Sequence, residues 1–167
     1  MRTLPVPGGL LKAQLPFRRN RLWITALRSG DEEIRMSIRK MIALHPDVQG
    51  HVNQPLGDAA HHLMYCARMC VSCADACGAE QMDMTQCIRI CLDCADICEA
   101  TGKLAVRRSG SNEAVLKEML EVCARACDAC ASECEKHDHE HCKLCAQICR
   151  ECADDCRKAS VTITPEQ

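Results

Sequence analysis

The sequence predicts an all-α fold, an antiparallel four-helix bundle with a cysteine-lined core, preceded by a short N-terminal helix and an extension. Three observations predict it: the spacing of the cysteines, the small residues beside them, and the short links between cysteine groups. The cysteines follow the pattern C-x3-C-x2-C-x3-C, and steps of four, three and four residues place the sulfurs on one stripe of a helix. A strand, with its period of two, would scatter them. The groups are Cys66, Cys70, Cys73 and Cys77; Cys87, Cys91, Cys94 and Cys98; Cys123, Cys127, Cys130 and Cys134; and Cys142, Cys145, Cys149, Cys152 and Cys156.

Each cysteine group marks one helix, and we expect these helices over 56–78, 84–107, 112–135 and 141–159. A shorter helix is expected over 34–45, ended by Pro46. Small residues such as Ala67 and Ala131 follow the inward cysteines and let helices approach closely. The links at 78–83 and 136–140 are short, so they require antiparallel neighbours. The last two groups repeat the first two at a nearly constant offset, which predicts a duplicated helical hairpin.

Length and charge limit the class of protein. The 167 residues fit one domain, and we expect a poorly ordered N-terminal extension over 1–35, a metal-binding four-helix bundle domain over 36–159 and a C-terminal tail over 160–167. A net charge of −2 and only three aromatic residues argue against nucleic-acid binding. No apolar run approaches the roughly 18 residues of a membrane helix, so no membrane partner is expected. The apolar run over 22–27 is too short for a signal peptide, which predicts a cytoplasmic protein.

The cysteine stripe admits several interpretations. Packing alone does not explain cysteine at so many core positions, where leucine or valine would bury more apolar area. Structural disulfides fit poorly because cysteines three or four residues apart on a helix have nearly parallel Cβ vectors. The run C-x3-C-x2-C resembles the iron–sulfur motif of radical SAM enzymes, but it occurs four times on predicted helices, whereas that motif lies on a loop, so we do not expect an iron–sulfur cluster. Thiolate binding of a soft metal remains, with Cu(I) and zinc as the leading ions.

Charge separates these two metals. If 17 thiolates bind Cu(I) one for one, the cluster is close to neutral, whereas four tetrahedral zinc ions with 16 thiolates carry a charge of −8. Uncompensated charge in a bundle core costs several kcal/mol per ion. A chain that binds many Cu(I) ions has the capacity of a store.

The two ends of the predicted bundle differ. At one end the core stripe continues as Leu63, Ala105, Leu116 and Leu120, so this end is expected to be shut. We expect His61 and His62, which lie there, to be surface or packing residues. The other end carries thioether and imidazole groups that can bind copper, and we expect the metal to enter and leave there. These groups belong to Met82, Met84, His137, His139 and His141.

The pattern resembles the cytosolic branch of the four-helix-bundle copper storage proteins. The resemblance covers 36 to about 159 and is carried by the four cysteine stripes, the runs MIALHP at 41–46 and CADICEATG at 94–102, and the stretch ECEKHDHEHC at 133–142. It implies Cu(I) bound by the inward cysteines, histidines near one mouth, and assembly into homo-tetramers. A copper chaperone is the expected donor.

We therefore expect a cytosolic store for Cu(I) that is not an enzyme. The sequence has no phosphate-binding loop, nucleophile elbow or zinc-hydrolase motif. Two alternatives stay open at this point: a zinc or cadmium thiolate sink, and a thiol redox buffer. The redox function would need an exposed thiol of low pKa, whereas these stripes are predicted to face inward.

Overall fold

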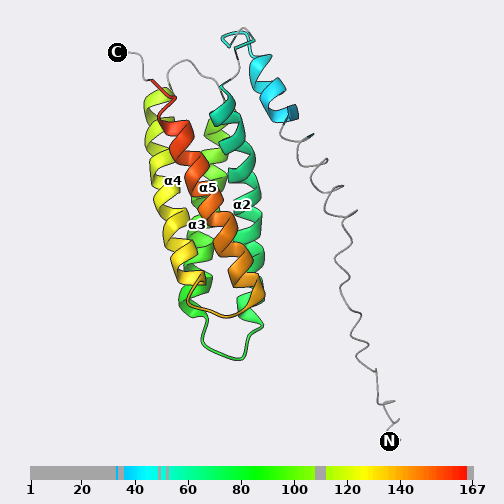
Figure 1. Cartoon of the computed structure of the whole chain (residues 1–167), viewed down its shortest axis with the longest axis vertical. Coiled ribbons are helices and arrows are strands. Elements are labelled where there is room, and N and C mark those ends of the chain that lie inside the picture. The colour runs from blue at the N-terminus through cyan, green and yellow to red at the C-terminus, as the bar shows by residue number, and fades with distance from the viewer. Residues whose placement is uncertain (1–32, 34–35, 49, 52, 108–111, 165–167) are drawn as a thin grey trace, which may run out of the picture.

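The computed structural model describes residues 33, 36–48, 50–51, 53–107 and 112–164, and within them it forms a helical bundle with no strand. Four long helices, α2 (Gln54–Gly78), α3 (Thr85–Ala105), α4 (Glu113–Cys134) and α5 (Glu140–Ser160), run alternately up and down (Figure 1). Each helix packs against the two that precede or follow it around the bundle, in the order α2, α3, α4, α5. The predicted four-helix bundle is confirmed, and each expected helix boundary lies within two residues of the observed one.

The start of α2 is fixed by local chemistry. The Asn53 side chain accepts a hydrogen bond from the backbone N–H of Leu56 at 3.0 Å, which satisfies one of the free amides of the first turn. Pro55 lies in that turn, where its missing N–H costs nothing. The Asn53 amide also donates to the hydroxyl of Thr162, so the beginning of α2 is tied to the segment after α5.

A shorter helix over 36–43 precedes the bundle, and the turns that follow it contain Pro46. It packs through Ile42, which is buried, and its Arg39 forms an ion pair with Asp58 on α2. Arg39 lies so close to Gly57 that a Cβ added to this glycine would stand 2.6 Å from the Arg39 Cγ. The absence of a side chain at Gly57 therefore lets the arginine cross the α2 backbone.

The described helices include none that is long and apolar enough to cross a membrane. The expected extension over 1–35 lies outside the described residues, apart from Glu33. The division of the chain into extension, bundle and tail stays a prediction.

The core of the bundle changes character along its length. All 17 cysteines are buried, none with more than 3% of its surface exposed. At the end where α2 and α4 begin, the core is instead closed by Leu63, Ala105, Leu116 and Leu120, each with no exposed surface. The bundle thus contains an apolar plug, formed by these four residues, and a channel of thiols that runs from the plug to the opposite end.

Candidate metal-binding channel

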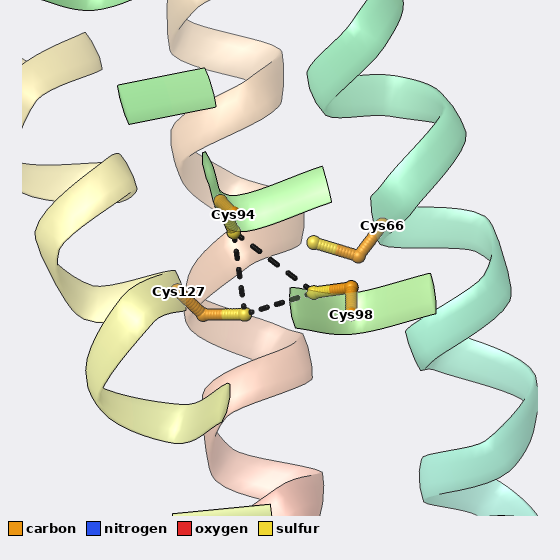
Figure 2. A group of neighbouring side chains, drawn as sticks. All are labelled: Cys66, Cys94, Cys98 and Cys127. Atoms are coloured by element: carbon orange, nitrogen blue, oxygen red, sulfur yellow. Dashed lines mark hydrogen bonds between the residues drawn. The ribbon is translucent and has the colours of Figure 1, made fainter. Parts of the chain in front are cut away.

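The cysteine stripes of all four helices point into one interior. Figure 2 shows Cys66 from α2, Cys94 and Cys98 from α3, and Cys127 from α4 directed toward a common centre. The Cys98 sulfur lies 3.5 Å from that of Cys127, and the Cys94 sulfur lies 3.7 Å from it. The cysteines that the sequence places on one face of each helix therefore meet in the interior of the bundle.

No disulfide links these sulfurs, since every cysteine is a free thiol. The contacts between them range from 3.5 Å, as between Cys70 and Cys149, to 4.0 Å, as between Cys77 and Cys142. A disulfide needs about 2.05 Å. The separations instead suit several thiolates around one metal ion, because the edge of a zinc–thiolate tetrahedron with bonds of about 2.3 Å measures about 3.8 Å.

The donor atoms form a continuous series of groups, which we call the sulfur ladder. Within each group all donor atoms lie within 4.8 Å of one another. Successive groups share members: Cys66 and Cys94 join the first to the second. Cys70 and Cys149 join the second to the third, Cys145 joins the third to the fourth, and Cys73 joins the fourth to the fifth. Five of these groups are Cys66, Cys94, Cys98 and Cys127; Cys66, Cys70, Cys94 and Cys149; Cys70, Cys130, Cys145 and Cys149; Cys73, Cys91, Cys134 and Cys145; and Cys73, Cys77, His141 and Cys142.

The last group of the ladder lies at the mouth, the end of the bundle formed by the links at 79–84 and 135–139 (lower end of Figure 1). Here the Nδ1 atom of His141 lies 3.5 Å from the sulfurs of both Cys73 and Cys142. Its Nε2 atom lies 3.2 Å from a carboxylate oxygen of Glu80. His141 therefore stands between the thiols and the first polar group outside them.

His139 continues this line outward. Its Nδ1 atom lies 3.2 Å from the same Glu80 oxygen, and its ring stacks on that of His141 with centroids 5.3 Å apart. Its Nε2 atom lies 3.4 Å from the sulfur of Met82, which is about half exposed. Soft and borderline donors thus follow one another without a gap from the surface at Met82 to the thiol of Cys73.

Charge states at the mouth differ from thiol to thiol. A hydrogen bond with Cys134 is the main cause that lowers the pKa of Cys73, to about 6, and His141 adds to the effect. Burial raises the pKa of Cys77, and it raises that of Cys142 to about 12. The hydrogen bond with Cys73, followed by that with Glu80, raises the pKa of His141. Near neutral pH, Cys73 is therefore the mouth thiol that is ready as a thiolate.

The other predicted mouth residues take different places. His137 is mostly buried, and its Nε2 atom lies 3.8 Å from a carboxylate oxygen of Glu133 rather than beside a sulfur. Met84 is buried at the start of α3. At the plugged end, the Nδ1 atom of His62 lies 2.7 Å from Asp155, and His61 is buried, as expected for a packing residue.

The sequence model of the copper storage proteins matches residues 52–161, which is most of the bundle. The chain belongs to the copper storage protein family. A relative from Bacillus subtilis, an uncharacterised cysteine-rich protein, is 39% identical over 83 residues, and that match covers 50% of this chain and 54% of the relative. The match thus spans about half the length of that relative.

Solved structures of copper storage proteins share this fold. A Streptomyces lividans copper storage protein loaded with 10 copper equivalents superposes with a TM-score of 0.70 at 36% identity, covering 74% of this chain and 98% of that one. A structure of copper loading to a cytosolic copper storage protein of the same organism, with five coppers, has a TM-score of 0.63 at 38% identity, covering 65% and 93%. The Cu(I)-bound Bacillus subtilis copper storage protein 3 has a TM-score of 0.55 at 34% identity, covering 62% and 95%.

In this copper storage protein the structure adds one residue that the sequence analysis did not single out. Glu80 lies in the link between α2 and α3, and its carboxylate is the common partner of His139 and His141. No spacing signal joins it to histidines that lie about 60 positions further along the chain. Only the antiparallel return of α5 to the mouth brings them together.

Proposed function

We propose that this chain is a cytosolic store for Cu(I) that holds many ions on the thiolates of the sulfur ladder. The observation that carries the proposal is the sharing of cysteines between successive donor groups. A thiolate that belongs to two groups can bridge two ions, so the ladder suits a continuous cluster better than a set of separate sites. Its membership in the copper storage protein family supports this function, and a storage role needs no catalytic group.

Zinc fits single groups of the ladder but not the whole. A structural zinc site uses four ligands of its own, so an ion in the group of Cys70, Cys130, Cys145 and Cys149 would take ligands from the groups on both sides. Zinc would also leave excess negative charge in a channel that no solvent reaches, since none of the thiols has more than 3% of its surface exposed. Cu(I) avoids both difficulties, because each ion replaces a thiol proton or, at Cys73, neutralises a thiolate.

Copper enters and leaves at the mouth in this proposal. The donors pass it from the Met82 thioether to His139, then to His141, and then to the thiolate of Cys73 or Cys142. The plug of Leu63, Ala105, Leu116 and Leu120 offers no ligand, so the channel fills from one end. Each thiol that binds copper releases a proton, since the ligand is the thiolate.

The donor of the copper is a copper chaperone, and the store assembles as a homo-oligomer, a tetramer by resemblance to its family. Delivery by a chaperone requires that a donor protein reach the mouth, where Met82 is about half exposed.

Anaerobic titration of the fully reduced protein with Cu(I), against a chelator that competes for Cu(I), tests the proposal. Saturation near the count of 17 cysteines supports a bridged Cu(I) cluster. Saturation near four ions per chain indicates separate tetrahedral sites and contradicts the proposal. Rapid reaction of most thiols with a bulky thiol reagent in the folded apo protein would instead favour a redox function.

A further inference from the structure

The mouth holds a second set of donor atoms, which lies outside the thiols and differs from them in chemistry. The Oε1 atom of Glu80 lies 3.2 Å from Nδ1 of His139 and 3.2 Å from Nε2 of His141. We call Glu80, His139 and His141 the outer triad. Their side chains are 31%, 28% and 26% exposed, so an ion from solvent can reach all three.

The outer triad has the spacing of a metal site. Zinc bonds to imidazole nitrogen at about 2.0–2.1 Å and to carboxylate oxygen at about 2.0–2.2 Å, so the edge of a tetrahedron with such bonds measures about 3.3 Å. Both distances from the Glu80 oxygen are close to this edge. Two imidazoles and one carboxylate are also the ligands of open zinc sites, in which water takes the fourth position.

The Glu80 carboxylate has no permanent cation beside it. In the part of the chain that the structure describes, its ion-pair partners are the two imidazoles, and no lysine or arginine pairs with it. By contrast, Glu133 pairs with Lys136 and Glu135 pairs with Arg150 at the same end of the bundle. The negative charge of Glu80 therefore remains available to a metal ion that displaces the imidazole protons.

The donor set of the outer triad selects a different ion from the sulfur ladder. Thiolates favour Cu(I), whereas two nitrogens and a carboxylate oxygen suit a divalent ion of borderline softness, such as zinc. In the copper-loaded chain the thiols are already occupied. The outer triad is then the group at the mouth whose chemistry and spacing suit a divalent ion.

An ion on the outer triad changes what His141 can do for copper. The Nδ1 atom of His141 lies 3.5 Å from the sulfurs of both Cys73 and Cys142, so this nitrogen faces the thiols that copper must reach. A neutral imidazole carries one N–H, and an ion on Nε2 therefore leaves the proton on Nδ1. That nitrogen then has no lone pair for Cu(I). The positive charge of the divalent ion also repels a copper ion that passes through the mouth.

We propose that the outer triad binds one divalent cation of the zinc class, and that this ion closes the mouth of the copper-loaded store. The effect on copper rests on the proposed function, whereas the divalent site itself stands on the triad alone. Zinc thus has a regulatory place outside the sulfur ladder and is not part of the stored metal.

The test uses the full chain, loaded with Cu(I) under anaerobic conditions until the thiols are saturated and then freed of excess copper. Equilibrium dialysis against chelator-buffered Zn²⁺ should show one zinc ion per chain in addition to the copper. Glu80→Gln and His139→Ala should each raise the zinc dissociation constant about tenfold or more. One equivalent of zinc should slow the loss of copper to a competing Cu(I) chelator at least threefold in the wild type, and should have no such effect in His139→Ala.

The matched control is His51→Ala, since His51 is an exposed histidine far from the mouth, and its zinc affinity should equal that of the wild type. Circular dichroism checks that each variant is folded. Co²⁺ in place of Zn²⁺ reports the ligands, because an ion bound by nitrogen and oxygen lacks the intense sulfur-to-cobalt charge-transfer band of a thiolate site.

The proposal is overturned if the loaded chain binds no zinc, if cobalt shows the sulfur band, or if both triad variants keep the wild-type zinc affinity. It is also overturned if bound zinc leaves the rate of copper loss unchanged. The copper content of each sample is measured in parallel. A low copper content together with a cobalt spectrum free of the sulfur band would contradict the copper store and leave the divalent site standing.

Discussion

Replacement of Cys149 by alanine tests whether the thiols act as one bridged cluster or as separate sites. Cys149 has no exposed surface, and its sulfur lies 3.5 Å from that of Cys70 and 3.7 Å from that of Cys66. It belongs to two donor groups of the sulfur ladder. In a bridged Cu(I) cluster, each ion can re-form its bonds with the sulfurs that remain. The variant should therefore lose capacity in proportion to the sulfur removed.

A bridged cluster and separate sites predict different losses of Cu(I) capacity. One sulfur among 17 corresponds to a loss of about one ion from a cluster that binds one Cu(I) per thiol. A chain with four separate tetrahedral sites would lose one site, which is a quarter of its capacity. In the apo protein the change removes one buried heavy atom. By analogy with a buried methylene, it should lower the free energy of unfolding by about 1 kcal/mol, or about 2–4 °C in Tm.

The assay is anaerobic titration of wild type and variant in parallel with Cu(I) in the presence of a competing chelator, followed by thermal melting of both apo proteins. Ile148→Val is the matched control, since Ile148 is buried beside Cys149 and this change also costs about 1 kcal/mol without removing a sulfur. Its capacity should equal that of the wild type. A loss of about a quarter of the capacity in Cys149→Ala, or an equal loss in Ile148→Val, would refute the bridged cluster.

Three further predictions concern the mouth and the plug. The rate of first Cu(I) uptake should rise as the pH passes upward through about 6, where Cys73 becomes a thiolate, and should level off above it. In stopped-flow measurements, Cys73→Ser should shift this rise to higher pH. An unchanged profile would argue against Cys73 as the first thiolate ligand. Glu80→Gln removes the negative charge beside His139 and His141 and should slow Cu(I) uptake several-fold, while the number of Cu(I) ions bound at saturation stays the same. A smaller number of ions at saturation would show that Glu80 is itself part of the store. Leu120→Ala opens a cavity in the plug and should lower the free energy of unfolding of the apo protein, measured by urea titration, by about 2–5 kcal/mol. The copper capacity should stay the same, and a lower capacity would show that the plug contributes to the metal site.

The fold could be predicted from the sequence because the spacing of the cysteines shows which face of each helix points inward. Steps of four, three and four between cysteines leave no freedom about which face points inward, and the observed helices agree with the expected ones to within two residues. The deviations have local causes. Helix α2 begins at Gln54 because Asn53 caps it and Pro55 fits its first turn. The shorter helix ends at residue 43, before the turns that contain Pro46, and not at residue 45.

What the sequence could not supply is the pairing across helices. That Cys149 meets Cys66 and Cys70 depends on how far α5 is displaced along α2, and helical periodicity says nothing about that displacement. The sequence did not indicate Glu80 for the same reason, since its histidine partners lie about 60 positions later in the chain. The division of roles among the histidines follows from the fold as well: His141 contacts thiols, whereas His137 lies beside Glu133.

The same side chains must form the core before copper arrives and bind it afterwards, and the structure suggests how both are achieved. Neutral thiols tolerate burial, so the apo bundle can fold with its ligands inside. Leucine, which contributes about 1.5–3 kcal/mol on full burial, is concentrated in the plug at Leu63, Leu116 and Leu120 and anchors the helices at one end. Exchange of a thiol proton for Cu(I) leaves the charge at that sulfur unchanged, and Cu(I) on the Cys73 thiolate neutralises it. Loading can therefore proceed from the mouth toward the plug without forcing the helices apart, as an accumulating negative charge would.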